Sequence, residues 1–406
     1  YQPKLPSSLQ NGVNSLELVE GSATQSVRDQ EQIQNLFANT YGKPTVTFKS
    51  TSSLSSSDVK NVGVILSGGQ APGGHNVIAG LYDALKSANS SNKLYGFLGG
   101  PSGIIEGKYI EFTDEYIDSY RNTGGFDIIG SGRTKLETEE QFKSSLEVCR
   151  KLNISAVVII GGDDSNTNAA LLAEWFVKNN TGIQVIGCPK TIDGDLKNEQ
   201  IEISFGFDTA TKTYAELIGN IERDANSAKK YWHFVKIMGR SASHVALEAA
   251  LQTQPNITLI SEEVEAKKMS LSSIIDYMSD IIVRRSENGK NFGIAVIPEG
   301  LIEFIPEMGS MISNLNDIMA SLESDSSFVN ASSSEKFSIV ESKLESENAK
   351  VYSSLPALIK EQLLADRDPH GNVQVSKIET EKLLIEMISA KLSEMKKAGK
   401  FSGKFS

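Results

Sequence analysis

Two apolar segments, each followed by an acidic loop, constrain this chain more than any other feature. Residues 156–160 read Ala-Val-Val-Ile-Ile, and residues 184–188 read Gln-Val-Ile-Gly-Cys. Short runs of branched apolar residues bounded by turn residues are typical of strands buried on both faces. Residues 169–178 between them have the pattern of a helix. The segment therefore predicts a β-α-β unit and, with it, a parallel sheet.

The loops that follow these two strands carry most of the chemistry. Residues 161–167 read Gly-Gly-Asp-Asp-Ser-Asn-Thr, and residues 189–195 read Pro-Lys-Thr-Ile-Asp-Gly-Asp. Ligands of open α/β sheets bind beyond the carboxyl ends of the strands. We therefore expect four carboxylates, a lysine and several glycines around one crevice. This combination indicates a site for a polyphosphate and a metal ion.

Composition limits the other classes of function. A chain of 406 residues with a net charge of −11 is long enough for two or more domains. It lacks the basic surface that nucleic acid or an anionic membrane requires, so we expect neither as a partner. Cys149 and Cys188 are too few for a disulfide framework and are interpreted as reduced and structural. No segment resembles a secretory signal or a membrane span, and we expect a cytoplasmic protein.

The order of strand, loop and helix repeats along the chain. This repetition predicts an α/β fold with two doubly wound, Rossmann-like parallel-sheet domains. The other segments expected to be strands are residues 61–66, 94–98, 126–129, 233–237, 258–261 and 292–297. The expected divisions are an N-terminal arm at 1–60, a phosphate- and metal-binding domain at 61–210, a second α/β domain at 211–306 and a helical insertion or appendage at 307–406.

The helical part has recognisable signals of its own. Residues 308–322 and 354–365 have helical spacing. Ser376-Lys-Ile-Glu379 resembles a capping box that opens a long amphipathic helix, and Gly399 is expected to end it.

A glycine-rich loop follows the first predicted strand of the α/β part. Residues 67–75 hold four glycines ahead of a predicted helix. Backbone N–H groups there can approach phosphate oxygens closely, and the start of the helix adds partial positive charge. The loop has neither the spaced glycines of a dinucleotide site nor the Gly-Lys-Ser/Thr of a P-loop. A tight turn without a ligand is the alternative.

The acidic loops have specific chemical uses. One of Asp163 and Asp164 can hold a magnesium ion that bridges phosphate oxygens, although capping of the following helix is the alternative. Asp193 and Asp195 flank a glycine, three and five residues after Lys190. A carboxylate beside a substrate hydroxyl can accept its proton as the oxygen attacks phosphorus, while cations stabilise the transferring group. Solvated acids in a turn are the alternative.

Three further side chains follow predicted strands. Arg133 and Arg240 supply guanidinium groups suited to anions, and Glu299 is placed to bind sugar hydroxyls. Each alone is more often structural, but their common position favours a site. His244, near Arg240, is the histidine best placed to take part. The four histidines and two cysteines have no zinc-ligand spacing, and no nucleophile elbow is present.

Four of these loops together resemble the phosphofructokinase family over about residues 61–305. Gly-Gly-Asp-x-Ser, Thr-Ile-Asp-x-Asp, Met-Gly-Arg and Pro-Glu-Gly occur here in the family's order. ATP-dependent members usually have glycine at the positions of Asp164 and Lys190, so the chain looks like the long pyrophosphate-dependent type, with its N-terminal arm and helical insertion. These two side chains should obstruct the α-phosphate of ATP, while the lysine pairs with a phosphate of pyrophosphate.

The resemblance implies a reversible transfer of a phosphoryl group from pyrophosphate to the 1-hydroxyl of fructose 6-phosphate, with Mg²⁺ as cofactor. It implies Asp193 as the general base, with Lys190 and Asp164 also catalytic. The residues implied around pyrophosphate are Gly69, Arg133, Asp164 and Lys190. Those implied at the sugar phosphate are Thr191, Asp193, Met238, Gly239, Arg240 and Glu299, and those implied for magnesium are Asp163 and Asp195. Family resemblance also implies a homo-oligomer, a dimer or tetramer, or pairing with a related regulatory subunit.

Two departures from the family pattern bear on these expectations. Family members continue past this chain's last residue with a Gly-Tyr-x-x-Arg segment that grips the 6-phosphate, so the second α/β domain is expected to be incomplete here. Tyr231 stands where many shorter relatives place an arginine that reaches a neighbouring subunit. The alternatives are an ATP-dependent phosphofructokinase, a non-catalytic regulatory subunit and, more distantly, a dinucleotide dehydrogenase.

Overall fold

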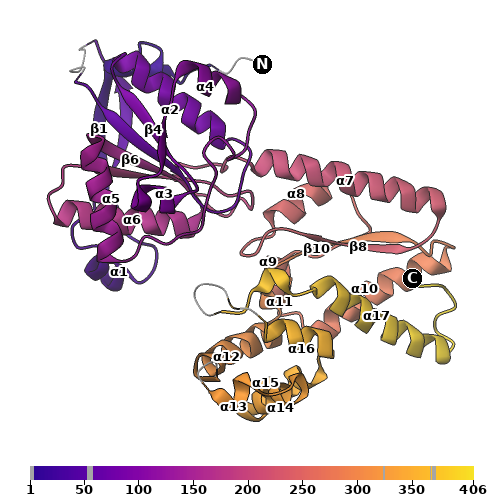
Figure 1. Cartoon of the computed structure of the whole chain (residues 1–406). Helices are drawn as coiled ribbons and strands as arrows, with labels where there is room; N and C mark the ends of the chain where they lie inside the picture. The colour runs from indigo at the N-terminus through magenta and orange to yellow at the C-terminus, as the bar shows by residue number, and fades with distance from the viewer. Residues whose placement is uncertain (1–3, 53–57, 323–324, 366, 368–371) are drawn as a thin grey trace. The chain divides into compact units, whose positions relative to one another are not determined.

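The chain forms two compact units, each with its own parallel sheet (Figure 1). The computed structural model describes residues 4–52, 58–322, 325–365, 367 and 372–406. The first unit comprises Tyr1–Thr191 and Leu196–Gly206, and the second comprises Ile192–Asp195 and Phe207–Ser406. The short loop Ile192–Asp195 therefore belongs with the second unit, although the chain on both sides of it belongs to the first.

The first unit is built on a five-stranded sheet in the order β5-β4-β3-β6-β7. Its strands are β3 (Asn61–Leu66), β4 (Lys93–Phe97), β5 (Tyr109–Glu111), β6 (Ile154–Gly161) and β7 (Gln184–Pro189). All are parallel except β5, which pairs antiparallel with β4. The predicted β-α-β unit is confirmed as β6, helix α6 (Asp163–Lys178) and β7.

Helices cover both faces of this sheet, because successive side chains of a buried strand point to opposite sides. Val64 packs in a cluster with residues of α2 (Gly74–Ala88) and α4 (Asp114–Tyr120). Its neighbour Ile65 packs in the cluster that includes residues of α3 (Pro101–Glu106), α5 (Glu139–Lys151) and α6.

The predicted strand at residues 126–129 is wrong, because this apolar segment forms turns. Gly124, Gly125 and Gly130 have φ angles of +72°, +88° and +67°, which bend the chain at both ends of it. The N–H of Ile128 donates to Nε2 of buried His75 at 3.2 Å instead of to a neighbouring strand. The segment is apolar because its side chains face the α2 cluster.

The N-terminal arm contains an antiparallel pair, β1 (Leu16–Ala23) and β2 (Pro44–Ser50), with short helices η1 (Ser7–Leu9), η2 (Val13–Ser15) and α1 (Gln30–Leu36). Glu174 of α6 holds it by accepting hydrogen bonds from the Asn39 N–H at 3.0 Å and the Thr40 hydroxyl at 2.8 Å.

The second unit has a three-stranded parallel sheet in the order β8-β10-β9, formed by β8 (Trp232–Ile237), β10 (Gly293–Pro298) and β9 (Ile257–Thr258). On one face, Ile294 packs with α7 (Phe207–Ala228) and α8 (His244–Thr253). On the other, Ala295 packs with α9 (Ser261–Ala266), α10 (Leu271–Glu287) and α11 (Leu301–Phe304). The strand expected at 258–261 is shorter than predicted, because Ser261 already begins α9.

The predicted helical appendage lies beside α10 and α11 (Figure 1). Its apolar side chains join those of the second face in one continuous cluster. Its helices are α12 (Pro306–Leu322), α13 (Ser326–Val329), α14 (Ser333–Lys343), α15 (Ser346–Ser354), α16 (Ala357–Leu363), η3 (Val375–Lys377) and α17 (Thr380–Lys397). The capping box predicted at Ser376 is wrong: the residue before α17 is Glu379, which makes no side-chain cap, and Ser376 lies in η3. A capping box occurs instead at Ser332 with Glu335, before α14.

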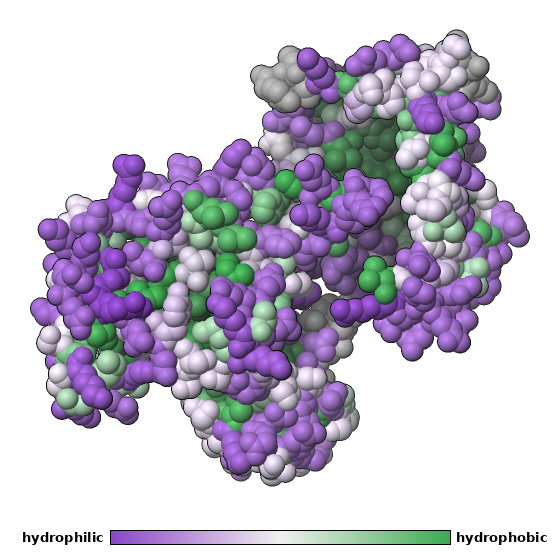
Figure 2. Space-filling model, turned by 180° about the vertical axis from the view of Figure 1, so that it is seen from behind, coloured by the Kyte–Doolittle hydropathy of each residue, from purple (hydrophilic) through white to green (hydrophobic). Residues whose placement is uncertain are grey.

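The α/β fold class with two doubly wound sheets and a helical appendage is thus confirmed. Hydrophilic side chains cover much of the face in Figure 2, and apolar side chains lie on the floor of a hollow in the first unit. Both cysteines are free thiols, and burial raises the pKa of Cys149 to about 12. In the part of the chain that the structure describes, no helix has both the length and the apolar content of a membrane span.

Candidate active site

Three loops meet at the carboxyl edge of the first sheet. Ser67, after β3, bridges to Gly132, and the Gly68 N–H donates to the Gly132 carbonyl at 3.0 Å. The hydroxyl of Ser165, in the first turn of α6, donates to the hydroxyl of Ser67 at 2.8 Å, and both side chains are buried. The glycine loop, the loop before Arg133 and the start of α6 therefore form one hydrogen-bonded edge.

Lys190 enters this edge from the end of β7. Only 8% of the residue is exposed, and its ammonium group donates to the Gly69 carbonyl at 2.6 Å. The same group lies 5.5 Å from the centre of the Phe126 ring. A buried ammonium needs such polar and aromatic partners. The structure therefore brings predicted residues Lys190 and Gly69 into direct contact.

Arg133 also lies close to this glycine. A Cβ atom on Gly69 would be 3.7 Å from Nη2 of Arg133, whose side chain is exposed. Two cations therefore lie at the glycine loop, which precedes α2 in the chain. This is a local positive region in a chain whose net charge is −11. Arginine and lysine donors beside a helix start suit a phosphate group.

Asp163 and Asp164 are the first two residues of α6, and both are exposed. The alternative that one of them is the N-cap is wrong, because Gly162 occupies that position. Carboxylates in the first turn interact favourably with the positive end of the helix and remain able to bind a cation.

Asp193 and Asp195 lie in the loop Ile192–Asp195 of the second unit, whereas Thr191 is the last residue of the first unit before this loop. Gly194 between the two acids has a φ of +74°, and a Cβ atom there would lie 2.8 Å from the Phe207 ring. Its carbonyl is 3.0 Å from Nδ1 of His244. Glycine is therefore required at this position both by the backbone angle and by close packing.

The segment Met238-Gly-Arg240 follows β8. Glu299 follows β10, which is the strand next to β8 in the sheet. The Glu299 N–H donates to the Ile237 carbonyl at 2.9 Å. A Cβ atom on Gly300 would lie 1.9 Å from the Arg240 carbonyl oxygen, so only glycine allows the two loops to approach this closely. The two motifs, Met-Gly-Arg and Pro-Glu-Gly, are thus in contact at the carboxyl edge of the second sheet.

The electrostatics of this second edge involve a residue that the sequence did not reveal. Burial raises the pKa of Glu299, and the Gly239 N–H and the cations of Lys236 and Arg240 oppose part of that rise. Burial also raises the pKa of Tyr214 on α7, and the Glu299 and Asp193 carboxylates raise it further, while the Met238 N–H opposes them. Tyr214 therefore lies near two predicted site residues, although a tyrosine inside a helix carries no loop motif.

Comparison with known proteins decides the family. The family model described as phosphofructokinase matches residues 61–339. The chain belongs to the phosphofructokinase family.

Several relatives are similar over nearly all of this phosphofructokinase chain. It is 57% identical, over its whole length and 73% of the relative, to pyrophosphate–fructose 6-phosphate 1-phosphotransferase of Porphyromonas gingivalis. It is 52% identical, over its whole length and 72% of the relative, to the protein of that name from Treponema pallidum. It is 51% identical to subunit beta 1 of the Arabidopsis thaliana enzyme, over 99% of the chain and 69% of the relative.

Solved structures agree with the fold. Phosphofructokinase from Saccharomyces cerevisiae superposes with a TM-score of 0.51 at 26% identity, over 59% of this chain and 33% of that one. A pyrophosphate-dependent phosphofructokinase from Nitrosospira multiformis superposes with a TM-score of 0.52 at 22% identity, over 60% of this chain and 61% of that one. The second likeness bears on the fold alone.

Magnesium in this phosphofructokinase would need an open site. Within the described residues, no three His, Cys, Asp or Glu side chains group as a metal site. Mg²⁺ commonly keeps several waters and is bound by one or two carboxylates together with substrate phosphates. Asp163 and Asp195 each offer carboxylate oxygens and so have that donor chemistry.

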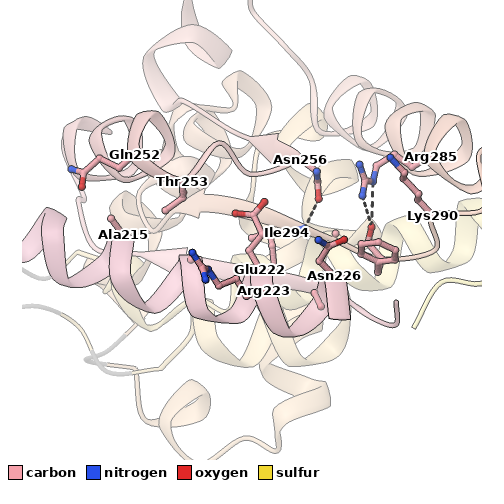
Figure 3. Close-up of a pocket in the computed structure, with 14 residues that line it drawn as sticks. Ala215, Glu222, Arg223, Asn226, Gln252, Thr253, Asn256, Arg285, Lys290 and Ile294 are labelled. Carbon is pink, nitrogen blue, oxygen red and sulfur yellow. Dashed lines mark hydrogen bonds between the residues drawn. The ribbon is translucent and has the colours of Figure 1, made fainter. Parts of the chain in front are cut away.

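A separate cavity of about 570 Å³ lies at the amino ends of the second sheet (Figure 3). Gly293, the first residue of β10, lines it together with Glu222 of α7. Arg285 donates to the Phe292 carbonyl from Nε at 3.2 Å and from Nη2 at 3.0 Å. None of the residues that the family resemblance implies lines this cavity.

Proposed function

We propose that this phosphofructokinase transfers a phosphoryl group from pyrophosphate to the 1-hydroxyl of fructose 6-phosphate, reversibly, giving fructose 1,6-bisphosphate and phosphate. The single observation that carries the choice of donor is buried Lys190, whose ammonium group contacts the Gly69 carbonyl in the glycine loop. A lysine at this position leaves less room for a nucleotide and supplies charge for a second phosphate group. The relatives named for pyrophosphate, at 57% and 52% identity, support the same donor.

The first unit is the proposed donor side. Lys190 and Arg133 bind and orient pyrophosphate, and the glycine loop lets backbone N–H groups approach its oxygens. Asp163 and Asp195 are the residues that would hold Mg²⁺, which would neutralise charge on the phosphate oxygens. Asp164, beside Asp163, adds negative charge and bulk that disfavour ATP.

The second unit is the proposed acceptor side. Arg240 binds the sugar phosphate, and Thr191, Met238, Gly239 and Glu299 complete the contacts. Asp193 accepts the proton of the 1-hydroxyl as its oxygen forms a bond to phosphorus and the bridging P–O bond of pyrophosphate breaks. The departing group is inorganic phosphate. Because no nucleoside triphosphate is consumed, the reaction can run in both directions.

A coupled assay for fructose 1,6-bisphosphate tests the proposal. The protein is expressed from its complete coding sequence, and its intact mass is verified. Fructose 6-phosphate and magnesium are supplied with either pyrophosphate or ATP. Turnover with pyrophosphate and little with ATP is expected. Turnover with ATP alone would overturn the assignment of Lys190 and Asp164, and no turnover with either would indicate a non-catalytic subunit.

Asp193→Ala tests the base within the same assay. Turnover should fall by orders of magnitude while affinity for pyrophosphate changes little, because the carboxylate acts on the acceptor hydroxyl. Glu199→Ala is the matched control, since it removes an exposed carboxylate close by in the sequence that has no assigned role. A fall of less than about tenfold in Asp193→Ala would show that another group takes the proton.

We also propose a cytoplasmic homo-oligomer, either a dimer or a tetramer. The relatives named as beta subunits, 51% and 50% identical to this chain, support an assembly with more than one chain. Light scattering on the purified full-length protein measures the mass of the assembly. A mass equal to one chain would contradict the proposal.

A further inference from the structure

The loop that carries Asp193 is held at one point by a histidine side chain. Asp193 lies in the four-residue loop Ile192–Asp195, between a segment that ends at Thr191 and one that starts at Leu196. The chain from 190 to 206 contains no helix or strand, so contacts with neighbouring elements help to position this loop.

Gly194 is the point of attachment. Its backbone has the left-handed φ of +74° and lies against the ring of Phe207, the first residue of α7. Its carbonyl oxygen is 3.0 Å from Nδ1 of His244. A carbonyl oxygen only accepts, so Nδ1 of His244 must carry the hydrogen of this bond. This holds whether the imidazole is neutral or protonated, and Nε2 is the ring nitrogen that remains.

His244 itself stands on a fixed element. It is the first residue of α8, directly after Ser243. The Ser243 N–H donates to Oε1 of Glu262 at 2.9 Å, and the Ser243 hydroxyl accepts from the Ser261 N–H at 2.9 Å. These bonds tie the start of α8 to the start of α9, and Ser243 and Ser261 are both buried. The imidazole thus projects from a rigid junction of two helices.

We propose that His244 is a positioning residue: its Nδ1–H holds the Gly194 carbonyl and so fixes the direction of the Asp193 carboxylate toward the acceptor hydroxyl. This inference rests on the proposed function, in which Asp193 is the base. His244 need not touch the substrate to act in this way. A general base must be within hydrogen-bond reach of the proton that it removes, and a misplacement of about 1 Å can cost up to about a hundredfold in rate.

Three substitutions test which of the two ring nitrogens of His244 holds the loop. His244→Asn places an amide N–H the same number of bonds from Cα as Nδ1, whereas His244→Gln places one at the distance of Nε2. His244→Ala removes both. If Nδ1–H holds the loop, kcat should fall about tenfold in the alanine and glutamine variants, and the asparagine variant should stay within about threefold of the parent.

The other readouts distinguish positioning from general destabilisation. The KM for pyrophosphate should change less than kcat, because Gly69, Arg133 and Lys190 belong to the first unit and only Asp195, a proposed magnesium ligand, lies in the loop that His244 contacts. The pH profile of the asparagine variant should match that of the parent, because the amide keeps the hydrogen bond and does not titrate. Melting temperatures of the three variants should not rank with their kcat values.

Several outcomes would overturn the inference. These are an unchanged kcat in His244→Ala, equal losses in His244→Asn and His244→Gln, or loss of one limb of the pH profile in His244→Asn. The last result would make His244 a titrating group. Asp193→Ala, measured in parallel, distinguishes a failure of the proposed function from a failure of this inference. If Asp193→Ala stays active, the proposed base is wrong. If Asp193→Ala is inactive and His244→Ala is unaffected, only the inference about His244 is wrong.

Discussion

Glu299 is half-buried, and the cations beside it limit how far its pKa rises. Burial disfavours the carboxylate and raises the pKa, while the Gly239 N–H, Lys236 and Arg240 favour the charged form. Lys236→Gln removes one of these cations, so the pKa of Glu299 should rise further. Carboxyl-carbon NMR titration measures it, with the Glu299 signal assigned by its absence in Glu299→Gln.

The matched control is Lys236→Arg, which keeps the positive charge and should leave the titration of Glu299 close to that of the parent. A pKa of Glu299 that falls in Lys236→Gln would show that the lysine does not stabilise the carboxylate.

Asp164 and Lys190 should determine the choice of phosphoryl donor. The double variant Asp164→Gly with Lys190→Gly removes a carboxylate and a buried ammonium group beside the glycine loop, and should admit ATP to a measurable degree. Equilibrium binding of ATP and of pyrophosphate to the parent and the double variant measures the change. Affinity for pyrophosphate should fall, since one of its two cations at the Gly69 loop is lost.

Asp164→Asn with Lys190 intact is the matched control, and it should exclude ATP as the parent does because the bulk of both side chains is kept. Undetectable ATP binding in the double glycine variant would mean that other residues select the donor.

At the scale of residues, the sequence predicts side chains that follow strands, because the carboxyl ends of parallel strands share one edge. Gly69 and Lys190 follow β3 and β7, and the structure brings them together as this rule requires. Arg133 follows no strand, and its loop reaches Gly69 through the bridge between Gly132 and Ser67. Tyr214 could not be predicted in this way. It lies inside α7 and approaches Asp193 and Glu299 only through the packing of that helix on the second sheet.

At the scale of elements, local patterns fail where long-range partners replace the local ones. The apolar segment 126–129 has the composition of a strand, but glycines at both ends turn it and His75 takes an N–H that a ladder would use. Ser376 and Glu379 have the spacing of a capping box, yet the Glu379 N–H donates to Oε1 of Gln362 at 2.8 Å. The Ser376 and Ile378 carbonyls accept hydrogen bonds from Lys236 of β8. No pattern within the segment reveals a lysine so far away in sequence.

Lys236 should therefore anchor the appendage to the second sheet. Its ammonium group donates to the Ile378 carbonyl at 3.0 Å and lies 3.5 Å from Oε2 of Glu381, a buried oxygen near the start of α17. Lys236→Met leaves that carboxylate without its cation and should lower the free energy of unfolding by about 2–3 kcal/mol. Urea denaturation followed by circular dichroism measures the change.

Lys236→Met with Glu381→Leu is the matched variant for this anchor. Removing both charges should recover a large part of the lost stability, because no buried charge then remains unpaired. A double variant as unstable as Lys236→Met, or a single variant as stable as the parent, would show that the ion pair does not hold α17.

At the scale of the whole molecule, each unit should respond to its own ligand. The net charge of −11 makes the chain repel anions on average, so an anionic ligand must bind where cations are concentrated. In the first unit, Arg133 and Lys190 lie at the glycine loop, and in the second, Arg240 follows β8. Pyrophosphate with magnesium should therefore slow amide hydrogen exchange at residues 67–70 and 131–133, and fructose 6-phosphate should slow it at 238–240 and 299–300.

Mass spectrometry of peptides from the exchanged protein resolves the two responses, with sulfate at the same ionic strength as the control for general anion binding. The amino ends of the second sheet, at 256 and 293, provide an internal reference that neither ligand should protect. Protection at 238–240 by pyrophosphate alone, or at 67–70 by fructose 6-phosphate alone, would reverse the roles of the two units. Such a reversal would also place the pyrophosphate site away from Lys190. The experiment therefore tests whether the first unit binds the phosphoryl donor and the second binds the acceptor, as the proposed chemistry requires.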